Sequence, residues 1–215
     1  MRQFAFLIVA VLVIGLMACD KPVSSAGPVA PVPADPWRAA AVTDPAAELY
    51  ASCASCHMAD GSGRTDGTIP RLAGQRPAVL IHKLEKLQVG AVTLPVMLPY
   101  ARSLIGEEIT AVAQYLAGLP VPEYPVITTA GEGSYRSLCA GCHGSAAEGI
   151  DALRSPRLCA QHAPYLVRRM EQIAVNQRGD ADPAMAALAG AVSADTRQQI
   201  AQWLAQGSCA EPQNP

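Results

Sequence analysis

This sequence has few aromatic residues and a small net charge. Of its 215 residues only 5% are Phe, Trp or Tyr, and the formal net charge at pH 7 is -2. Nucleic-acid binding calls for a strongly basic surface, which such a chain lacks. A small domain with few large rings buries little apolar area unless a cofactor or a covalent link completes its core. We therefore expect no nucleic-acid partner, and cores that are filled partly by something other than side chains.

A long apolar run stands at the beginning of the chain. Residues 4–18 read FAFLIVAVLVIGLMA and follow Arg2. This run is short for a membrane-spanning helix but typical of a secretory signal peptide. Its end, Leu16 to Cys19, resembles the lipobox of bacterial lipoproteins, which implies a signal peptide at residues 1–18 and lipidation of Cys19. The alternative is an ordinary secretory signal or an uncleaved anchor, with Cys19 incidental.

The segment at residues 19–43 is rich in proline and alanine and has no periodic apolar face. Such a composition is typical of a flexible linker. We interpret it as a lipid-anchored tether, with a cleavable spacer as the alternative. Asp20 resembles the signal that retains lipoproteins at the inner membrane. We therefore expect a periplasmic protein that its N-terminal lipid anchors to the inner membrane, in an oxidising compartment.

The remaining sequence repeats itself after about 86 residues. The stretch YASCASCHMADG recurs as LCAGCHGSAAEG, and IPRLAGQ recurs as SPRLCAQ. Matched pairs separated by 86 or 88 positions are Cys53 and Cys139, Pro70 and Pro156, Leu72 and Leu158, Gln75 and Gln161, Met97 and Met185, and Tyr115 and Trp203. We predict two homologous domains at residues 44–120 and 133–209, a linker at residues 121–132 and a tail at residues 210–215.

Both repeats are predicted to be all-α. Asp44 followed by proline is typical of a helix N-terminus, and Ser193 is a second candidate N-cap. Apolar side chains at helical spacing, acidic first turns and terminal glycines mark the further helices. These helices are expected over residues 78–88, 106–118, 165–175 and 193–207. No segment shows convincing strand-like alternation of apolar and polar residues.

Each repeat carries one Cys-x-x-Cys-His motif. The motif residues are Cys53, Cys56 and His57 in the first repeat and Cys139, Cys142 and His143 in the second. A thioredoxin-like dithiol needs a strand–helix context, and a structural zinc site needs a further ligand that neither repeat offers nearby. Covalent haem fits every feature, because two thiols add to the two vinyl groups of one porphyrin and the next histidine ligates the iron. We expect two covalently bound haems c, with His57 and His143 as proximal ligands.

Methionine is the expected ligand on the other side of each iron. Met97 and Met185 occupy matching positions ahead of the last helix of each repeat. Met58 adjoins the first proximal histidine and cannot reach the opposite side. His82 and His162 are not matched between the repeats, so we interpret them as surface or locally hydrogen-bonded residues. His–Met ligation at both irons would leave no coordination site open to a substrate.

The paired motifs, PRLAGQ with its variant PRLCAQ, and the terminal AVAQYLAG resemble class I dihaem cytochromes c of the cytochrome c-four type. The resemblance covers about residues 45–208. It implies three main helices around one haem in each domain, and two domains related by a pseudo-twofold axis. It also implies that the carbonyls of Pro70 and Pro156 orient the imidazoles of His57 and His143.

Two features depart from that family. Its members commonly carry an arginine near a haem propionate after the middle helix, and an alignment without gaps puts Arg178 there in the second repeat but Val92 in the first. We therefore expect a higher reduction potential in the second domain. The other departure is Cys159 and Cys209, which the haem motifs do not use. Two such cysteines in an oxidising compartment favour a disulfide, with two separate buried thiols as the alternative.

These expectations indicate an electron-transfer protein without catalytic residues or a small-molecule substrate. We expect it to carry electrons between a membrane quinol-oxidising complex or a periplasmic dehydrogenase and a terminal acceptor such as a haem–copper oxidase. A dedicated cytochrome subunit of a periplasmic dehydrogenase or other redox enzyme would have the same two domains and stays open as the alternative. A dihaem peroxidase is disfavoured, because it needs an open or switchable distal site.

Overall fold

The structure is a computed structural model that describes residues 44–122, 124–125 and 128–206. The expected signal peptide, Cys19, the tether, Cys209 and the tail lie outside these ranges. Within them, no helix is both long enough and apolar enough to cross a membrane.

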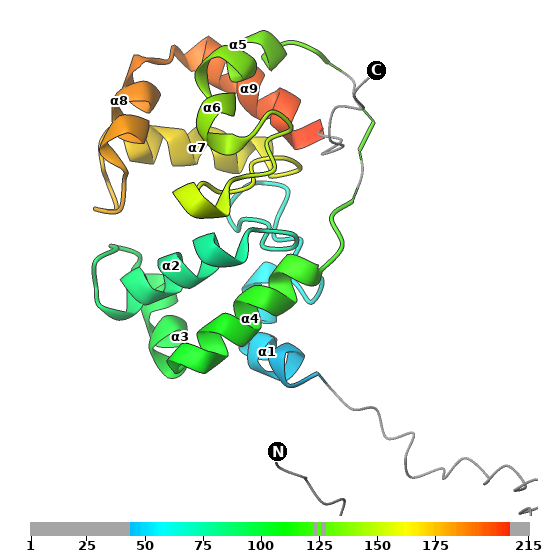
Figure 1. The fold of residues 1–215 in the computed structure, drawn as a ribbon, viewed down its shortest axis with the longest axis vertical. Coiled ribbons are helices and arrows are strands. Elements are labelled where there is room, and N and C mark those ends of the chain that lie inside the picture. Colours follow the sequence, from blue (N-terminus) through cyan, green and yellow to red (C-terminus); the bar gives the residue numbers. More distant parts are fainter. Residues whose placement is uncertain (1–43, 123, 126–127, 207–215) are drawn as a thin grey trace, which may run out of the picture. The chain divides into compact units, whose positions relative to one another are not determined.

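The first repeat is helical, as predicted (Figure 1, blue to green). Its elements are α1 (Pro45–His57), α2 (Pro77–Gln88), η1 (Pro95–Met97, a 3-10 turn), α3 (Leu98–Ser103) and α4 (Gly106–Gly118). Helix α4 contacts both α1 and α2. It buries Ile109, Val112, Ala113 and Leu116, which follow the i, i+3, i+4, i+7 spacing of a helix with one apolar face.

The second repeat has the corresponding helices (Figure 1, green to red). Its elements are α5 (Glu132–Leu138), α6 (Ala140–His143), η2 (Asp151–Leu153, a 3-10 turn), α7 (Ala163–Ala174), α8 (Pro183–Ala191) and α9 (Ala194–Gln206). Helix α9 contacts α5 and α7 as α4 contacts α1 and α2. The extended pairing in the described residues is one isolated antiparallel bridge, between Ile150 and Ser155. The all-α prediction is therefore confirmed for the described residues.

Two helix starts have the caps that the sequence predicts. Asp44 Oδ1 accepts a hydrogen bond from the Ala46 N–H at 2.9 Å, and Pro45 occupies the first position of α1. Ser193 Oγ accepts one from the Thr196 N–H at 3.1 Å, at the start of α9. Each cap satisfies a backbone donor that the helix itself leaves free, which is worth about 1 kcal/mol.

A tyrosine in each repeat ties the haem-motif helix to the residue after the motif. Tyr50 donates a hydrogen bond from its hydroxyl to the Met58 carbonyl at 2.7 Å, and Tyr135 donates one to the Gly144 carbonyl at 2.6 Å. Tyr135 is one residue further from its motif than Tyr50, and the helix of the second repeat is interrupted at Cys139. The extra residue lies at the break between α5 and α6, so the tyrosine contact is kept.

Each repeat has its own hydrophobic core. In the first, Tyr50 packs with Leu80 from α2 and Leu116 from α4. In the second, Tyr135 packs with Leu166 from α7 and with residues of α9. Burying such a side chain fully contributes about 1.5–3 kcal/mol. Both cores thus lie between the motif helix, the middle helix and the last helix.

The repeats contact each other through matched residues. The side chain of Gln161 accepts a hydrogen bond from the Arg71 N–H at 3.0 Å and donates one to the Arg71 carbonyl at 2.9 Å. Gln75 makes the same two bonds to Arg157, accepting at 2.8 Å and donating at 3.0 Å. Because the glutamines and the arginines are each matched between the repeats, the contact is reciprocal, as in an interface around a twofold axis.

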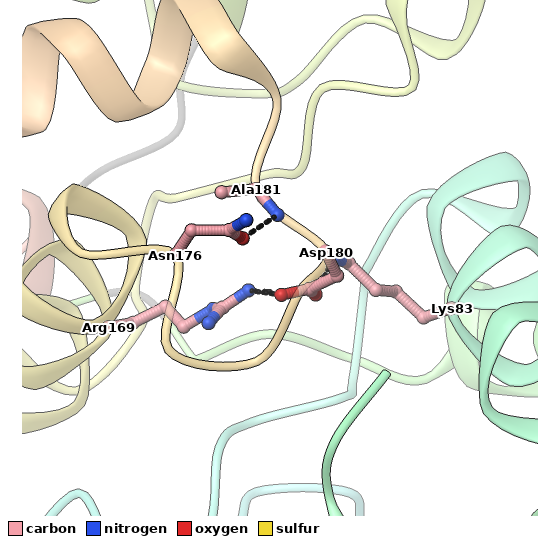
Figure 2. Close-up of polar contacts among 5 residues, drawn as sticks. All are labelled: Lys83, Arg169, Asn176, Asp180 and Ala181. Atoms are coloured by element: carbon pink, nitrogen blue, oxygen red, sulfur yellow. Dashed lines mark hydrogen bonds and ion pairs between the residues drawn. The ribbon is translucent and has the colours of Figure 1, made fainter. Parts of the chain in front are cut away.

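An ion cluster at Asp180 also joins the repeats (Figure 2). Lys83 Nζ lies 2.5 Å from Asp180 Oδ2, and Arg169 Nη2 lies 2.7 Å from Asp180 Oδ1. Lys83 and Arg169 are matched positions, so one carboxylate binds the equivalent cation of each repeat. Burial acts to raise the pKa of Asp180, but the hydrogen bonds from Lys83 and Arg169 outweigh it and lower the pKa to about 2. The carboxylate is therefore ionised throughout the neutral range.

His162 lies at this contact between the repeats rather than at the surface. Its residue is 8% exposed, and its Nε2–H donates a hydrogen bond to the Ser62 carbonyl of the other repeat at 2.7 Å. The expectation of a surface or locally bonded residue is wrong for His162. Its partner is 100 positions away in the chain, and helical periodicity carries no information about such a contact.

Candidate haem sites

Each Cys-x-x-Cys-His motif lies at the C-terminal end of a helix. Cys53 and Cys56 are three residues apart in α1, so both thiols lie on the same side of the helix, and His57 is its last residue. The second motif, residues 139–143, likewise ends at the last residue of α6. None of these four cysteines is paired in a disulfide, so each sulfur is available to a vinyl group of haem.

The motif histidines are buried, and each directs one ring nitrogen to a proline carbonyl. His57 is 6% exposed, and its Nδ1–H donates to the Pro70 oxygen at 3.1 Å. His143 is 7% exposed and donates in the same way to the Pro156 oxygen at 3.0 Å. Burial lowers the pKa of both imidazoles, and the bond to proline opposes this only in part. The neutral ring with a free Nε2 is the form that ligates iron, and both contacts are those that the resemblance implied.

A glycine in each repeat makes room for the proline loop. The Gly63 N–H donates to the His57 carbonyl at 3.0 Å, and the Gly149 N–H donates to the His143 carbonyl at 2.8 Å. The φ angles are 68° and 78°, and a Cβ on Gly63 would lie 2.5 Å from the Pro70 oxygen. A larger residue would therefore displace the acceptor of the His57 bond. Neither glycine was predicted to have this role, although their separation of 86 positions was a usable signal in the sequence.

Met97 and Met185 stand at equivalent places ahead of α4 and α9. Met97 ends η1 and packs against the cluster of Leu87, Val92 and Ala101. Met185 is the third residue of α8. Both methionines are partly buried. The positions agree with the repeat, and the ligation of iron by these sulfurs stays a prediction.

Arg178 lies between α7 and α8, at the edge of the other repeat. Its carbonyl accepts a hydrogen bond from the Thr93 N–H at 2.8 Å. Its residue is partly buried, and burial, followed by the positive charge of Arg169, lowers the pKa of its guanidinium. Its counterpart Val92 is 4% exposed. The two repeats therefore differ by one partly buried charge here, and its contact with a propionate stays a prediction.

Several buried arginine N–H groups have no hydrogen-bond partner among the described residues, which bears on whether the chain can hold haem. Four such atoms have no hydrogen-bond partner among the described residues: Arg76 Nε, Arg157 Nε, Arg169 Nη1 and Arg197 Nε. A buried donor without a partner costs about 1–3 kcal/mol. Burial and then the like charge of Arg76 lower the pKa of Arg157, so these two cations lie close together. Haem propionates are anions that accept such bonds, so the unpartnered donor of Arg157, which directly follows the proline that binds His143, fits the expected cofactor.

Comparison with known sequences matches a family model once in each repeat. The family described as cytochrome c oxidase, cbb3-type, subunit III, matches residues 40–116 and again residues 127–204. A thiosulfate dehydrogenase electron acceptor of Stutzerimonas stutzeri is 33% identical over 169 residues, which cover 72% of this chain and 78% of that protein.

Comparison with solved structures gives two similar folds. Reduced cytochrome c4 from Pseudomonas stutzeri superposes with a TM-score of 0.68 at 22% identity, over 76% of this chain and 97% of that chain. Thiosulfate dehydrogenase from Marichromatium purpuratum superposes with a TM-score of 0.61 at 30% identity, over 75% of this chain and 37% of that chain. This chain is therefore similar to a whole dihaem cytochrome and to one part of a larger enzyme.

Replacing either Met97 or Met185 by alanine is expected to remove about half of the weak long-wavelength charge-transfer absorption of Met-ligated ferric haem. Each methionine would serve one of two equivalent irons. Optical spectra of the oxidised protein, normalised to haem content, measure this band. Met58→Ala is the matched control and should leave the band whole. An undiminished band in the Met97 or the Met185 variant would contradict the axial assignment.

Proposed function

This chain belongs to the class I cytochromes c, with one haem c bound covalently in each of two tandem domains, and we propose that it accepts electrons from a dehydrogenase that oxidises thiosulfate. Electron transfer is the function of this family of dihaem proteins, either as carriers or as cytochrome subunits of dehydrogenases. The identity of the donor is the step that we add.

The ligand residues that we propose are repeated in the two domains. Cys53 and Cys56 would hold the first haem, and Cys139 and Cys142 the second. The iron ligands would be His57 with Met97, and His143 with Met185. When bound, each haem supplies one-electron chemistry between ferric and ferrous iron. With a histidine and a methionine on each iron, neither haem would keep a coordination site for a substrate, and we do not expect the chain to be an enzyme itself.

The observation that carries the choice of donor is the extent of the match to a thiosulfate dehydrogenase electron acceptor. That match covers 72% of this chain, so it reaches into both domains, and it covers 78% of the relative. The similarity to 37% of a thiosulfate dehydrogenase chain supports the same donor, since a region with the fold of this chain is there part of the enzyme itself.

A terminal oxidase is the acceptor that we propose. Both domains match a family described as a subunit of a cbb3-type cytochrome c oxidase, and a haem–copper oxidase was the acceptor expected from the sequence. A quinol-oxidising complex stays the second candidate for the donor.

We also propose that Cys19 is lipidated and that residues 19–43 tether the domains to the periplasmic face of the inner membrane. A flexible linker of some two dozen residues would span about 25 Å, enough reach to meet more than one partner.

Mixing the oxidised holoprotein with a purified thiosulfate dehydrogenase and thiosulfate is expected to reduce both haems. Stopped-flow absorbance of the reduced haem bands measures the rate and the two electrons taken up per chain. Mixtures that lack either the enzyme or thiosulfate are the controls and should stay oxidised. Failure of the complete mixture, with full reduction by a quinol-oxidising complex and quinol, would rule out the sulfur donor and favour the second candidate.

We propose that Cys159 and Cys209 form a disulfide in the second domain. Cys159 is 4% exposed and is not one of the four cysteines of the haem motifs. Closing a loop of about 50 residues would stabilise the domain by about 4 kcal/mol in the chain-entropy account. Mass spectrometry of the denatured, unreduced holoprotein after alkylation should find neither cysteine modified. Modification of both would show that the bridge is absent.

Arg178→Val is expected to lower the reduction potential of the second haem. A positive charge stabilises the reduced haem, and at about 8 Å with an effective dielectric near 20 it is worth about 2 kcal/mol. That bounds the shift at about 90 mV for one electron, before solvent screening. Redox titration should also find the second haem at the higher potential in the wild type. An unchanged second potential in the variant, or a reversed order in the wild type, would refute this role.

A further inference from the structure

One peptide group in each repeat takes part in two hydrogen bonds that matter to the haem site. The Pro70–Arg71 peptide accepts the His57 Nδ1–H bond at its oxygen, while its N–H donates to Gln161 of the other repeat. The Pro156–Arg157 peptide does the same with His143 and with Gln75. The acceptor of each motif histidine therefore belongs to the peptide that the opposite repeat holds.

Each glutamine side chain is fixed in place by several bonds at once. Gln161 Oε1 accepts from the Arg71 N–H at 3.0 Å and from the His162 N–H at 3.1 Å, and its Nε2 donates to the Arg71 carbonyl. Gln75 has the equivalent set, with the Arg76 N–H at 3.0 Å as the second donor. Gln161 is 6% exposed, so water does not compete freely for the bonds that it makes.

The two hydrogen bonds of a peptide group polarise each other. When the N–H donates to an acceptor, the carbonyl oxygen becomes more negative and accepts a stronger hydrogen bond, with a gain in strength of about 10–30% per bond. A stronger pull on the imidazole Nδ1–H makes the ring a better electron donor through Nε2. A ligand of that kind favours the ferric over the ferrous state.

We propose that Gln75 and Gln161 are positioning residues that tune the haem of the opposite domain, Gln161 acting on the first haem through His57 and Gln75 on the second through His143. The proposal rests on the iron-ligand roles of these histidines. It makes the contact between the domains part of each redox centre, because separating the domains removes both glutamine bonds. It also explains why both glutamines are matched although neither contacts a motif histidine directly.

The test is a pair of variants, Gln161→Leu and Gln75→Leu, with each haem titrated separately through its own NMR resonances during stepwise reduction. Gln161→Leu should shift the reduction equilibrium of the first haem toward the ferrous form by about threefold, equivalent to about 30 mV for one electron. The second haem should shift by less than half as much. Gln75→Leu should give the mirror pattern.

The proton resonance of Nδ1–H in the reduced protein supplies a readout that does not depend on electron transfer. A weaker bond should move the His57 resonance upfield in Gln161→Leu, and the His143 resonance upfield in Gln75→Leu. Gln161→Glu keeps the acceptor oxygen, so the His57 resonance should stay in place or move downfield. This variant carries the test if the leucine variants do not load haem.

The matched control is His162→Leu, which removes a bond between the domains, to the Ser62 carbonyl, without touching either Pro–Arg peptide. It should leave both Nδ1–H resonances in place. The proposal is overturned if Gln161→Leu shifts the haem of its own domain, shifts both equally, or merely reproduces His162→Leu. A wild type without two hydrogen-bonded Nδ1–H resonances would instead refute the iron-ligand assignment, and the choice of donor enzyme is tested separately by the reduction assay.

Discussion

The hydrogen bond from the motif histidine to a proline carbonyl is the contact on which each domain depends. The histidine ends a helix, and the proline returns to it thirteen positions later in both repeats. The returning loop is held by backbone bonds, from Leu72 to the Gly61 carbonyl in the first repeat and from Leu158 to the Ala147 carbonyl in the second. The loop thereby sets the tautomer and the direction of a buried ring, which neither the helix nor the core alone would fix.

The same proline loops also form the contact between the domains. Each loop therefore serves both a haem site and the domain contact. The residue after each proline binds a glutamine of the other repeat, and Asp180 binds the matched cations Lys83 and Arg169. A carboxylate this deeply buried is stable only because both cations reach it. The two repeats are copies of one domain, so the same glutamine and arginine positions supply both sides of the contact.

The local features of the fold could be predicted because they depend on neighbouring residues. The last helix of the first repeat was expected over residues 106–118, and α4 has these bounds. Asp44 and Ser193 cap their helices as expected, since a capping side chain reaches a backbone N–H only two or three residues away. The roles of Gly63 and Gly149 escaped prediction. The requirement for glycine at these positions follows from the folded structure, in which a Cβ would lie too close to the proline loop.

By itself the sequence determined the two domains, their helices, the haem motifs and the pairs of residues that match between the repeats. Those properties follow from spacing along the chain, which helical periodicity and motif chemistry convert directly into structure. Only the tertiary structure decided that Gln75 and Gln161 reach across to the opposite proline loop, and that His162 is buried against Ser62. These partners lie 82 to 100 positions apart, and what brings them together is the packing of one folded domain against the other.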